Sequence, residues 1–582
     1  MLYKFTVDIP SADGKIIITK RKNVSYVMYT YRQDYVKDKG YSLPRRAVIG
    51  RVAKEPGKMY PNEKFEEYFP DIALPEELPE TDRSCSLRIG SYAVIKNVME
   101  EYKLPDLLYK RFGEKTGLLL DLVSYLIVDE DNAGQYYPDY AYSHPLFSQD
   151  MNIYSDSTVS RFLKSVTENQ TLGFLDDWNE GRDKRQRIYI SYDSTNKFCQ
   201  AGDIEMVEFS KAKDGRKLPV FNVSVAYDKT NKVPLLYEEY PGSIVDVSQL
   251  SFLIEKVNDY GYKNVGFILD RGYFSKENIQ YMDANGYSFI VMCKGCKALV
   301  SSLVMGHRNT FETDRSCLIR QYRAYGTTFQ AKMYADDEKE RYFHIFYNPS
   351  RQAAEREKIE GTIEKFRSFL EKQIGSANTF GDTYKKYFEL TYAKDNTLAG
   401  VKEKSDVVQK ELELCGYFCI ITSEEMTAEK ALILYKSRDV SEKLFRSDKS
   451  FIGSKSMRVQ TNEAMSAKIF VEFIALIVRN RMYCLLRNTM MRMEKRSNFL
   501  TVPAAIRELE KIEMVRRTGK TYKLDHAVTK NQKTILSSFG MDENSIRTTA
   551  NEIGKALAES KDSQKNETEE KEDGEEEIDS LD

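Results

Sequence analysis

Four side chains that can hold a metal ion or a phosphodiester lie within residues 431–450. Tyr435, Arg438, Glu442 and Lys449 belong to a stretch of strong helix formers without Gly or Pro. At about 100° per residue they project within a stripe about 60° wide on one helix face. A carboxylate there can ligate a cation while the phenol, guanidinium and ammonium groups hold phosphate oxygens. The alternative is a solvated helix face with an Arg438–Glu442 pair at i,i+4.

Two aspartates lie at predicted strand ends far upstream. Asp193 is expected near the C-terminal end of a strand in RIYISYDST, and Asp270 ends the apolar run VGFILD. Two Mg²⁺ ions at a phosphoryl-transfer site need carboxylates that converge from separate elements, which makes Asp193, Asp270 and Glu442 a candidate metal site. A strand-end aspartate is also a common turn former, and the chain has 89 acidic residues. Spacing alone leaves both explanations open.

The composition indicates a multidomain globular protein. A chain of 582 residues is too long for one core, and 41% hydrophobic with 30% charged residues is ordinary. The net charge of −2 hides an asymmetry, because residues 559–582 hold twelve acidic and three basic residues and the rest carries +7. Eight scattered Cys indicate reduced thiols in a cytosolic protein, and four separated His argue against zinc. No segment is expected to span a membrane.

The pattern of hydrophobic and turn residues predicts a multidomain α/β protein. Three antiparallel strands followed by alternating helix and strand, from residue 187 to 293, is the ribonuclease H order. Around it we expect the following parts: a small β unit (1–80), a helical region (86–180), the first part of the core (187–293), an inserted β-rich subdomain (294–410), the rest of the core with the helix of Tyr435 (411–497), a C-terminal unit (498–558) and a disordered acidic tail (559–582). The basic residues of the β unit either contact DNA phosphates or form a solvated sheet face, and the helical region either contacts DNA or is a plain helical bundle.

The same chemistry-bearing residues resemble the motifs of a known family. The series Y-x2-R-x3-E-x6-K, met by Tyr435, Arg438, Glu442 and Lys449 with every spacing, looks like the signature of DDE transposases of bacterial insertion sequences. The branch it resembles is the fourth insertion-sequence family with its close relatives.

Three further motifs support this resemblance, which covers about residues 187–480. YDSTN around Asp193 and ILDRGYFS around Asp270 are similar to the first and second aspartate motifs, and PGS followed by Asp246 is similar to the element between them. The long gap after Asp270 is similar to the β-strand insertion of this branch. The chain departs from some relatives because its only Trp, Trp178, lies outside the insertion, so the aromatic that stacks on a flipped base is unassigned.

The resemblance implies a ribonuclease H-like catalytic core with two Mg²⁺ ions, for which Mn²⁺ can substitute, held by Asp193, Asp270 and Glu442. Tyr435, Arg438 and Lys449 would position phosphates at the transposon end, and Arg271 would add a phosphate contact unless it forms a structural salt bridge. The implied partners are double-stranded DNA, as inverted-repeat ends and as target, and a second copy in a homodimeric DNA complex. The implied location is the nucleoid in the bacterial cytoplasm.

The implied activity is cleavage at the ends of an insertion sequence, hairpin formation and reopening, and transfer of the 3′ ends into target DNA. Each step is an in-line displacement at phosphorus, so one two-metal site can serve them all. One alternative is a ribonuclease H-like endonuclease without strand transfer. Another is a DNA-binding regulator derived from a transposase.

Overall fold

The computed structural model divides the chain into two compact units, which we describe separately. It describes all residues except 1–4, 13, 22–23, 37–40, 73, 75–82, 130–132, 202–203, 212–216, 245, 294–296, 335–336, 338, 439–455, 496–498, 517–520 and 577–582. Unit 1 comprises residues 1–87, 514–525 and 550–582, and unit 2 comprises residues 88–513 and 526–549. The predicted C-terminal unit, 498–558, is therefore divided between the two. No helix in the described part of the chain is long and apolar enough to cross a membrane.

Unit 1 contains the predicted N-terminal sheet. Its strand order is β1-β5-β4-β3-β2, and all neighbouring strands are antiparallel. The strands are β1 (Val7–Asp8), β2 (Ile16–Arg21), β3 (Val24–Val36), β4 (Tyr41–Val52) and β5 (Lys58–Pro61). Helix α1 (Glu63–Tyr68) supplies Phe65 to a core with Val27, Ile49 and Met59, all fully buried. β-Branched and aromatic residues alternate along β3 and favour this half-buried sheet.

Unit 1 also contains part of a helix at the C-terminal end of the chain. Helix α19 runs Glu543–Glu576, and the predicted disordered tail overlaps it, while the side chains of residues 560–576 are not described. The same unit holds residues 514–525, where the Tyr522 hydroxyl donates to the carbonyl of Ser84 at 2.6 Å. Ser84 also accepts through its hydroxyl from the backbone N–H of Ser86.

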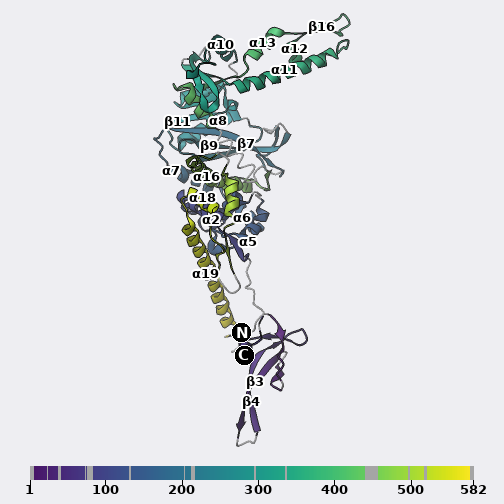
Figure 1. Cartoon of the computed structure of the whole chain (residues 1–582), viewed down its shortest axis with the longest axis vertical. Helices are drawn as coiled ribbons and strands as arrows, with labels where there is room; N and C mark the ends of the chain where they lie inside the picture. Colours follow the sequence, from purple (N-terminus) through teal and green to yellow (C-terminus); the bar gives the residue numbers. More distant parts are fainter. Residues whose placement is uncertain are drawn as a thin grey trace. The chain divides into compact units, whose positions relative to one another are not determined.

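Unit 2 begins with the predicted helical region. It consists of α2 (Gly90–Glu101), α3 (Leu104–Phe112), α4 (Thr116–Val128), α5 (Tyr137–Ser143), α6 (Asp156–Ser165) and α7 (Glu168–Glu180). Ser155 caps α6 as its position predicts, because its hydroxyl accepts from the backbone N–H of Thr158 at 3.3 Å. The long helix α16 (Asn462–Arg492) packs against α2, α4 and α6 and also against strand β10, which joins the helical region to the sheet (Figure 1).

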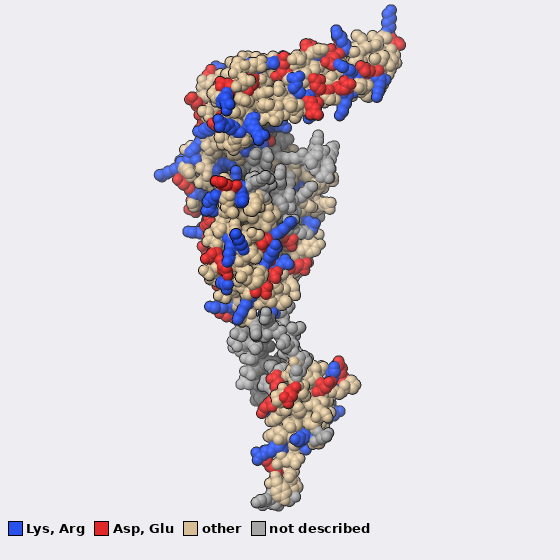
Figure 2. Space-filling view, viewed as in Figure 1, with Lys and Arg blue, Asp and Glu red and all other residues tan. Residues whose placement is uncertain are grey.

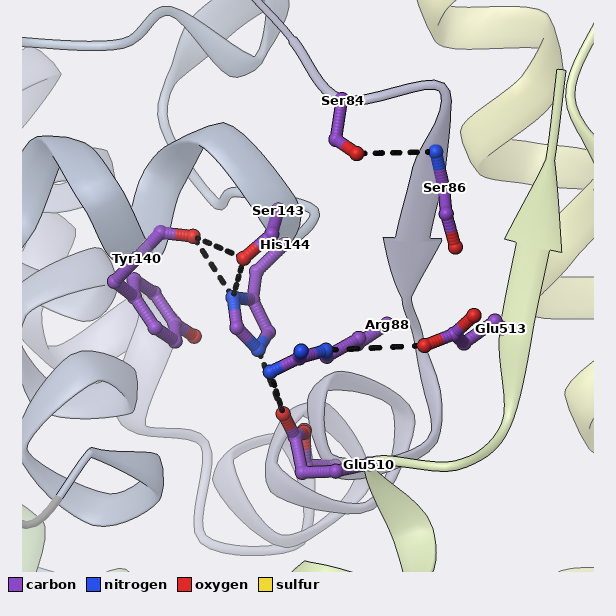
Figure 3. Close-up of polar contacts among 9 residues, drawn as sticks. Ser84, Ser86, Arg88, Tyr140, Ser143, His144, Glu510 and Glu513 are labelled. Atoms are coloured by element: carbon purple, nitrogen blue, oxygen red, sulfur yellow. Dashed lines mark hydrogen bonds and ion pairs between the residues drawn. The ribbon is translucent and has the colours of Figure 1, made fainter.

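Polar contacts connect the residues after α17 (Val502–Leu509) to the helical region of unit 2 (Figure 3). The buried His144 lies 2.8 Å from Glu510 through Nε2 and 2.8 Å from the Tyr140 carbonyl through Nδ1. These two contacts fix the orientation of the imidazole ring. Arg88 lies between Glu510 and Glu513, 3.8 Å from each carboxylate. This cluster is structural and lies in a part of unit 2 that the candidate site does not use.

The sheet of unit 2 has the order β10-β9-β7-β11-β12-β18-β15-β14-β13, with β8 beside β9 and β19 beside β7. Its first strands are β7 (Ile188–Cys199), β8 (Glu208–Lys211), β9 (Lys217–Asp228) and β10 (Val233–Pro241), followed by α8 (Asp246–Asp259), β11 (Val265–Leu269), α9 (Lys276–Ala284) and β12 (Ser288–Met292). Strands β7, β9 and β10 are antiparallel neighbours, while β11 is parallel to β7 and β12 is parallel to β11. The predicted sequence of three antiparallel strands followed by alternating helix and strand is present.

The region predicted as a β-rich insertion differs from that expectation in two ways. Strands β13 (Leu318–Ile319), β14 (Ala324–Lys332) and β15 (Glu340–Tyr347) extend the main sheet through β18 (Tyr417–Thr422). The remainder is a mixed lobe of α11 (Pro349–Glu371), α12 (Asp382–Tyr387), β16 (Phe388–Tyr392), β17 (Leu398–Glu403) and α13 (Ser405–Glu413). Its own core includes Ile363, Leu370, Phe388 and Leu398. Long-range pairing of β15 with β18, which local patterns do not encode, joins this region to the core sheet.

Candidate active site

The structure brings Asp193 and Asp270 side by side. Strands β7 and β11 are parallel, and Tyr192 lies opposite Leu269. The next residue after each of these is an aspartate, Asp193 on β7 and Asp270 directly after β11. Adjacent strands are about 4.8 Å apart. The Asp193 carboxylate accepts from the backbone N–H of Ser194 at 2.9 Å, and the Asp270 carboxylate accepts from the backbone N–H of Arg271 at 2.7 Å. The two aspartates therefore occupy neighbouring positions where β11 ends.

One local prediction about this site is wrong. Asp193 was expected near the end of its strand, but β7 continues to Cys199 and remains paired with β9 as far as Phe198. The extension is possible because Lys197, although charged, is buried against Glu472 of α16 with 2.5 Å between Nζ and Oε2. The sequence signal for this pair is Glu472, an acidic residue inside the otherwise apolar stretch 469–478.

Helix α14 (Ala428–Lys436) places two of the predicted phosphate-binding residues on Asp270. The Arg438 Nη1 atom lies 2.8 Å from the Asp270 carboxylate, and the Tyr435 hydroxyl lies 3.4 Å from the same oxygen. The Arg438 guanidinium also lies 5.3 Å from the centre of the Tyr435 ring. The side chain of Arg438 is 12% exposed and that of Asp270 38%, so the pair sits at the edge of the core with one side open to solvent.

The core of the sheet explains why α14 lies there. Its residues Ala431, Leu432 and Tyr435 are buried in one cluster with Ile268 of β11 and Ile290 of β12. Ile268 and Asp270 are two residues apart and therefore project from the same face of the sheet. The Thr427 hydroxyl caps the helix by accepting from the backbone N–H of Lys430 at 3.2 Å.

The helix predicted for residues 431–450 ends earlier than expected. Helix α14 stops at Lys436, and the Ser437 hydroxyl donates to the carbonyl of Leu434 at 2.5 Å. The next backbone N–H, that of Arg438, bonds to the carbonyl of Tyr435, three residues back, as in a tightening last turn. The two remaining predicted site residues, Glu442 and Lys449, lie outside the described residues.

Arg271, predicted as a weaker phosphate contact, lies on the short helix η4 (Arg271–Tyr273) and is exposed. It lines a cavity of about 810 Å³ between the sheet and helices α10 (Lys297–His307) and α13, together with Met292, Cys293, Val304 and Phe418. Among the described residues no group of three or more His, Cys, Asp or Glu side chains could hold a metal ion.

A comparison with protein families identifies this arrangement. Residues 193–478, which begin at Asp193 and include Asp270, match the family described as the transposase DDE domain. The matched segment spans just under half of the chain. The protein is accordingly an enzyme of the DDE transposase type. No curated protein is significantly similar to the chain.

Two solved transposase structures are distantly similar to the chain. The cryo-EM structure of the piggyBac transposase synaptic complex with hairpin DNA has a TM-score of 0.34 and 8% sequence identity, over 72% of this chain and 76% of that one. The Mos1 transposase paired-end complex with the left transposon end has a TM-score of 0.13 and 10% identity, over 39% of this chain and 65% of that one. Scores this low do not establish a common fold.

Proposed function

We propose that this DDE transposase cleaves DNA at the ends of an insertion sequence and transfers the 3′ ends into target DNA, with Asp193, Asp270 and Glu442 as its three carboxylates. The observation that supports this most strongly is the register of β7 and β11, which aligns Asp193 with Asp270 inside the matched domain. The order β10-β9-β7-β11-β12 supports a ribonuclease H-like core. The motif resemblance to the fourth insertion-sequence family supports the choice of Glu442.

The two described carboxylates fit divalent metal ions. Both offer hard oxygen ligands, both are oriented by a backbone N–H bond, and Asp270 is partly open to solvent. A pair of Mg²⁺ ions, or Mn²⁺ in their place, would supply activation of the attacking oxygen and stabilisation of the leaving oxygen. The residues of the chain hold the carboxylates in place and balance their charge, since Arg438 neutralises Asp270 before any ligand binds.

We assign substrate positioning to Tyr435, Arg438, Lys449 and Arg271. Tyr435 of α14 and Arg438 of the turn after it converge on Asp270, so each lies within a side-chain length of a phosphate held at the two aspartates. Arginine is suited to this role because its planar fork binds phosphate through two parallel hydrogen bonds. We further propose that the protein works as a homodimer on paired ends, on nucleoid DNA in the bacterial cytoplasm.

Three substitutions and a matched control test this function. Asp193→Asn, Asp270→Asn and Glu442→Gln should each lower cleavage of a supercoiled plasmid carrying the inverted repeats that flank the gene by about 100-fold or more. Each variant should still bind these ends. Glu424→Gln, which alters an exposed carboxylate paired with Arg187, should cleave normally.

The same assay separates the alternatives. Full cleavage by any of the three variants would remove that residue from the site. Pre-cleaved ends should join to a supercoiled target, and cleavage without joining would instead favour an endonuclease. Binding without either activity in the unmodified protein would favour a regulator.

A further inference from the structure

Strands β3 and β4 continue beyond the sheet of unit 1 as a two-stranded ribbon. Strand β2 pairs with β3 only as far as Tyr29, and β5 pairs with β4 only from Gly50 onward. Between residues 31 and 46 the described parts of the two strands pair with each other alone. The ribbon is drawn at the bottom of Figure 1. Such a ribbon is marginally stable in water unless a partner covers it.

Cationic groups are concentrated on this ribbon. Arg32 lies directly opposite Arg45, an arrangement that is unfavourable for like charges. Asp34 is placed between them, 2.6 Å from the Arg32 Nε atom and 3.0 Å from the Arg45 Nε atom. The two arginine side chains are nevertheless 72% and 65% exposed, and the exposed Arg46 follows. Among the described residues of the ribbon, three guanidinium groups and one carboxylate therefore leave a net positive charge.

Large apolar side chains on the same ribbon are exposed to solvent. Tyr35 is 64% exposed, Tyr41 50% and Leu43 44%. Figure 2 shows the ribbon at the bottom of the view as mostly tan, with blue side chains near its base. Pro44 lies in the ribbon and removes a backbone donor, and Pro and charged residues discourage the addition of another strand. A second protein strand is thus a poor occupant.

We propose that the β3–β4 ribbon enters the major groove of double-stranded DNA. The proposed function is the basis for this inference, and the ribbon would bind the DNA substrate outside the active site. Two strands about 4.8 Å apart fit a groove about 12 Å wide, and the seven residues from Thr30 to Val36 reach about 23 Å, well beyond its depth of about 8.5 Å. Arginines contact phosphates and guanine edges, while tyrosine and leucine contact the bases.

A DNA-binding assay tests this ribbon separately from catalysis. The full-length protein is titrated against a labelled 30-base-pair duplex of mixed sequence in EDTA. Binding is measured by fluorescence anisotropy over a range of salt concentrations. Replacing Arg45 and Arg46 together by Ala should weaken binding about 30-fold at 0.15 M salt and reduce the salt slope by about 1.8. Replacing Lys54 and Lys64, two exposed cations of the same unit outside the ribbon, should change affinity less than about 2-fold. Replacing both arginines by Lys should keep the slope.

The outcomes separate the two proposals. A salt slope that falls by about 1.8 in the Ala variant alone, with an unchanged thermal unfolding curve, supports the ribbon. Duplexes whose major groove is blocked by glucosylated hydroxymethylcytosine should also bind weakly. Equal binding by the unmodified protein and the Ala variant would overturn the ribbon inference and leave the proposed function intact. No binding by the unmodified protein would overturn both.

Discussion

Replacing Arg438 by Gln should tighten the binding of a divalent cation to the DNA-free protein. In the structure the guanidinium of Arg438 lies 2.8 Å from the Asp270 carboxylate and neutralises a group that we assign to the metal. A cation that approaches Asp270 therefore meets an existing positive charge. Removing this charge returns the full negative charge of the carboxylate to the site, because Gln keeps a polar side chain of similar length without a charge.

The size of the effect follows from the position of the pair. Two unit charges about 4 Å apart interact with about 4 kcal/mol at an effective dielectric constant of about 20. Asp270 is 38% exposed, and solvent screening reduces this interaction to about 1.4 kcal/mol. The dissociation constant for Mn²⁺ should therefore fall about tenfold. DNA cleavage should fall at the same time, because the phosphate loses its guanidinium partner.

The assay is a titration of the DNA-free protein with Mn²⁺, in which free Mn²⁺ is followed by its electron paramagnetic resonance signal. Arg438→Lys retains the charge and should bind Mn²⁺ like the unmodified protein. Arg351→Gln, which removes a cation paired with Glu355 in the insertion, should also leave binding unchanged. Unchanged or weaker Mn²⁺ binding by Arg438→Gln would show that Arg438 does not compete for the metal-binding carboxylate.

Three further predictions concern the core and the tail. Lys197→Met should lower the free energy of unfolding by about 3–5 kcal/mol, because Glu472 stays buried without the lysine. Adding Glu472→Leu should restore the stability. Denaturant melts that show no loss in the single variant would contradict a buried pair. Burial raises the pKa of Glu239 from 4.5 to about 7, so its contribution to the free energy of unfolding is complete below about pH 4 and should decline by about 3 kcal/mol as pH rises to 8. Glu239→Gln should remove this part of the pH dependence in melts at each pH, and an unchanged pH dependence would exclude Glu239 as its source. Deleting residues 559–582 should leave DNA cleavage intact, and loss of activity in the plasmid assay would assign the tail a necessary role.

Much of the fold could be predicted where local patterns decide it. The strands of residues 1–80, the helical region of residues 86–180 and the alternation of helix and strand in residues 187–293 all follow from the period of the hydrophobic residues. Pairing between distant strands could not be predicted in this way, which is why the strands of the insertion proved to extend the main sheet through β18.

The site could be predicted in part for the same reason. Motif spacing selected Asp193 and Asp270 as candidates, and the register of β7 and β11 places the two residues at neighbouring positions. The extension of β7 depends on the buried ion pair between Lys197 and Glu472, which are far apart in the sequence. The early end of α14 depends on the turn at Ser437. These contacts are tertiary or depend on local competition for backbone groups, so helix and strand propensities do not show them.

The most direct test of the central claim is a crystal structure of the protein with Mn²⁺ and a duplex carrying one end of the element, with anomalous diffraction measured at the manganese edge. The account predicts an anomalous peak at coordination distance, about 2.1 Å, from carboxylate oxygens of both Asp193 and Asp270, with Glu442 in the same coordination sphere. Manganese bound elsewhere, or bound to one of the two aspartates while the other points away, would contradict it.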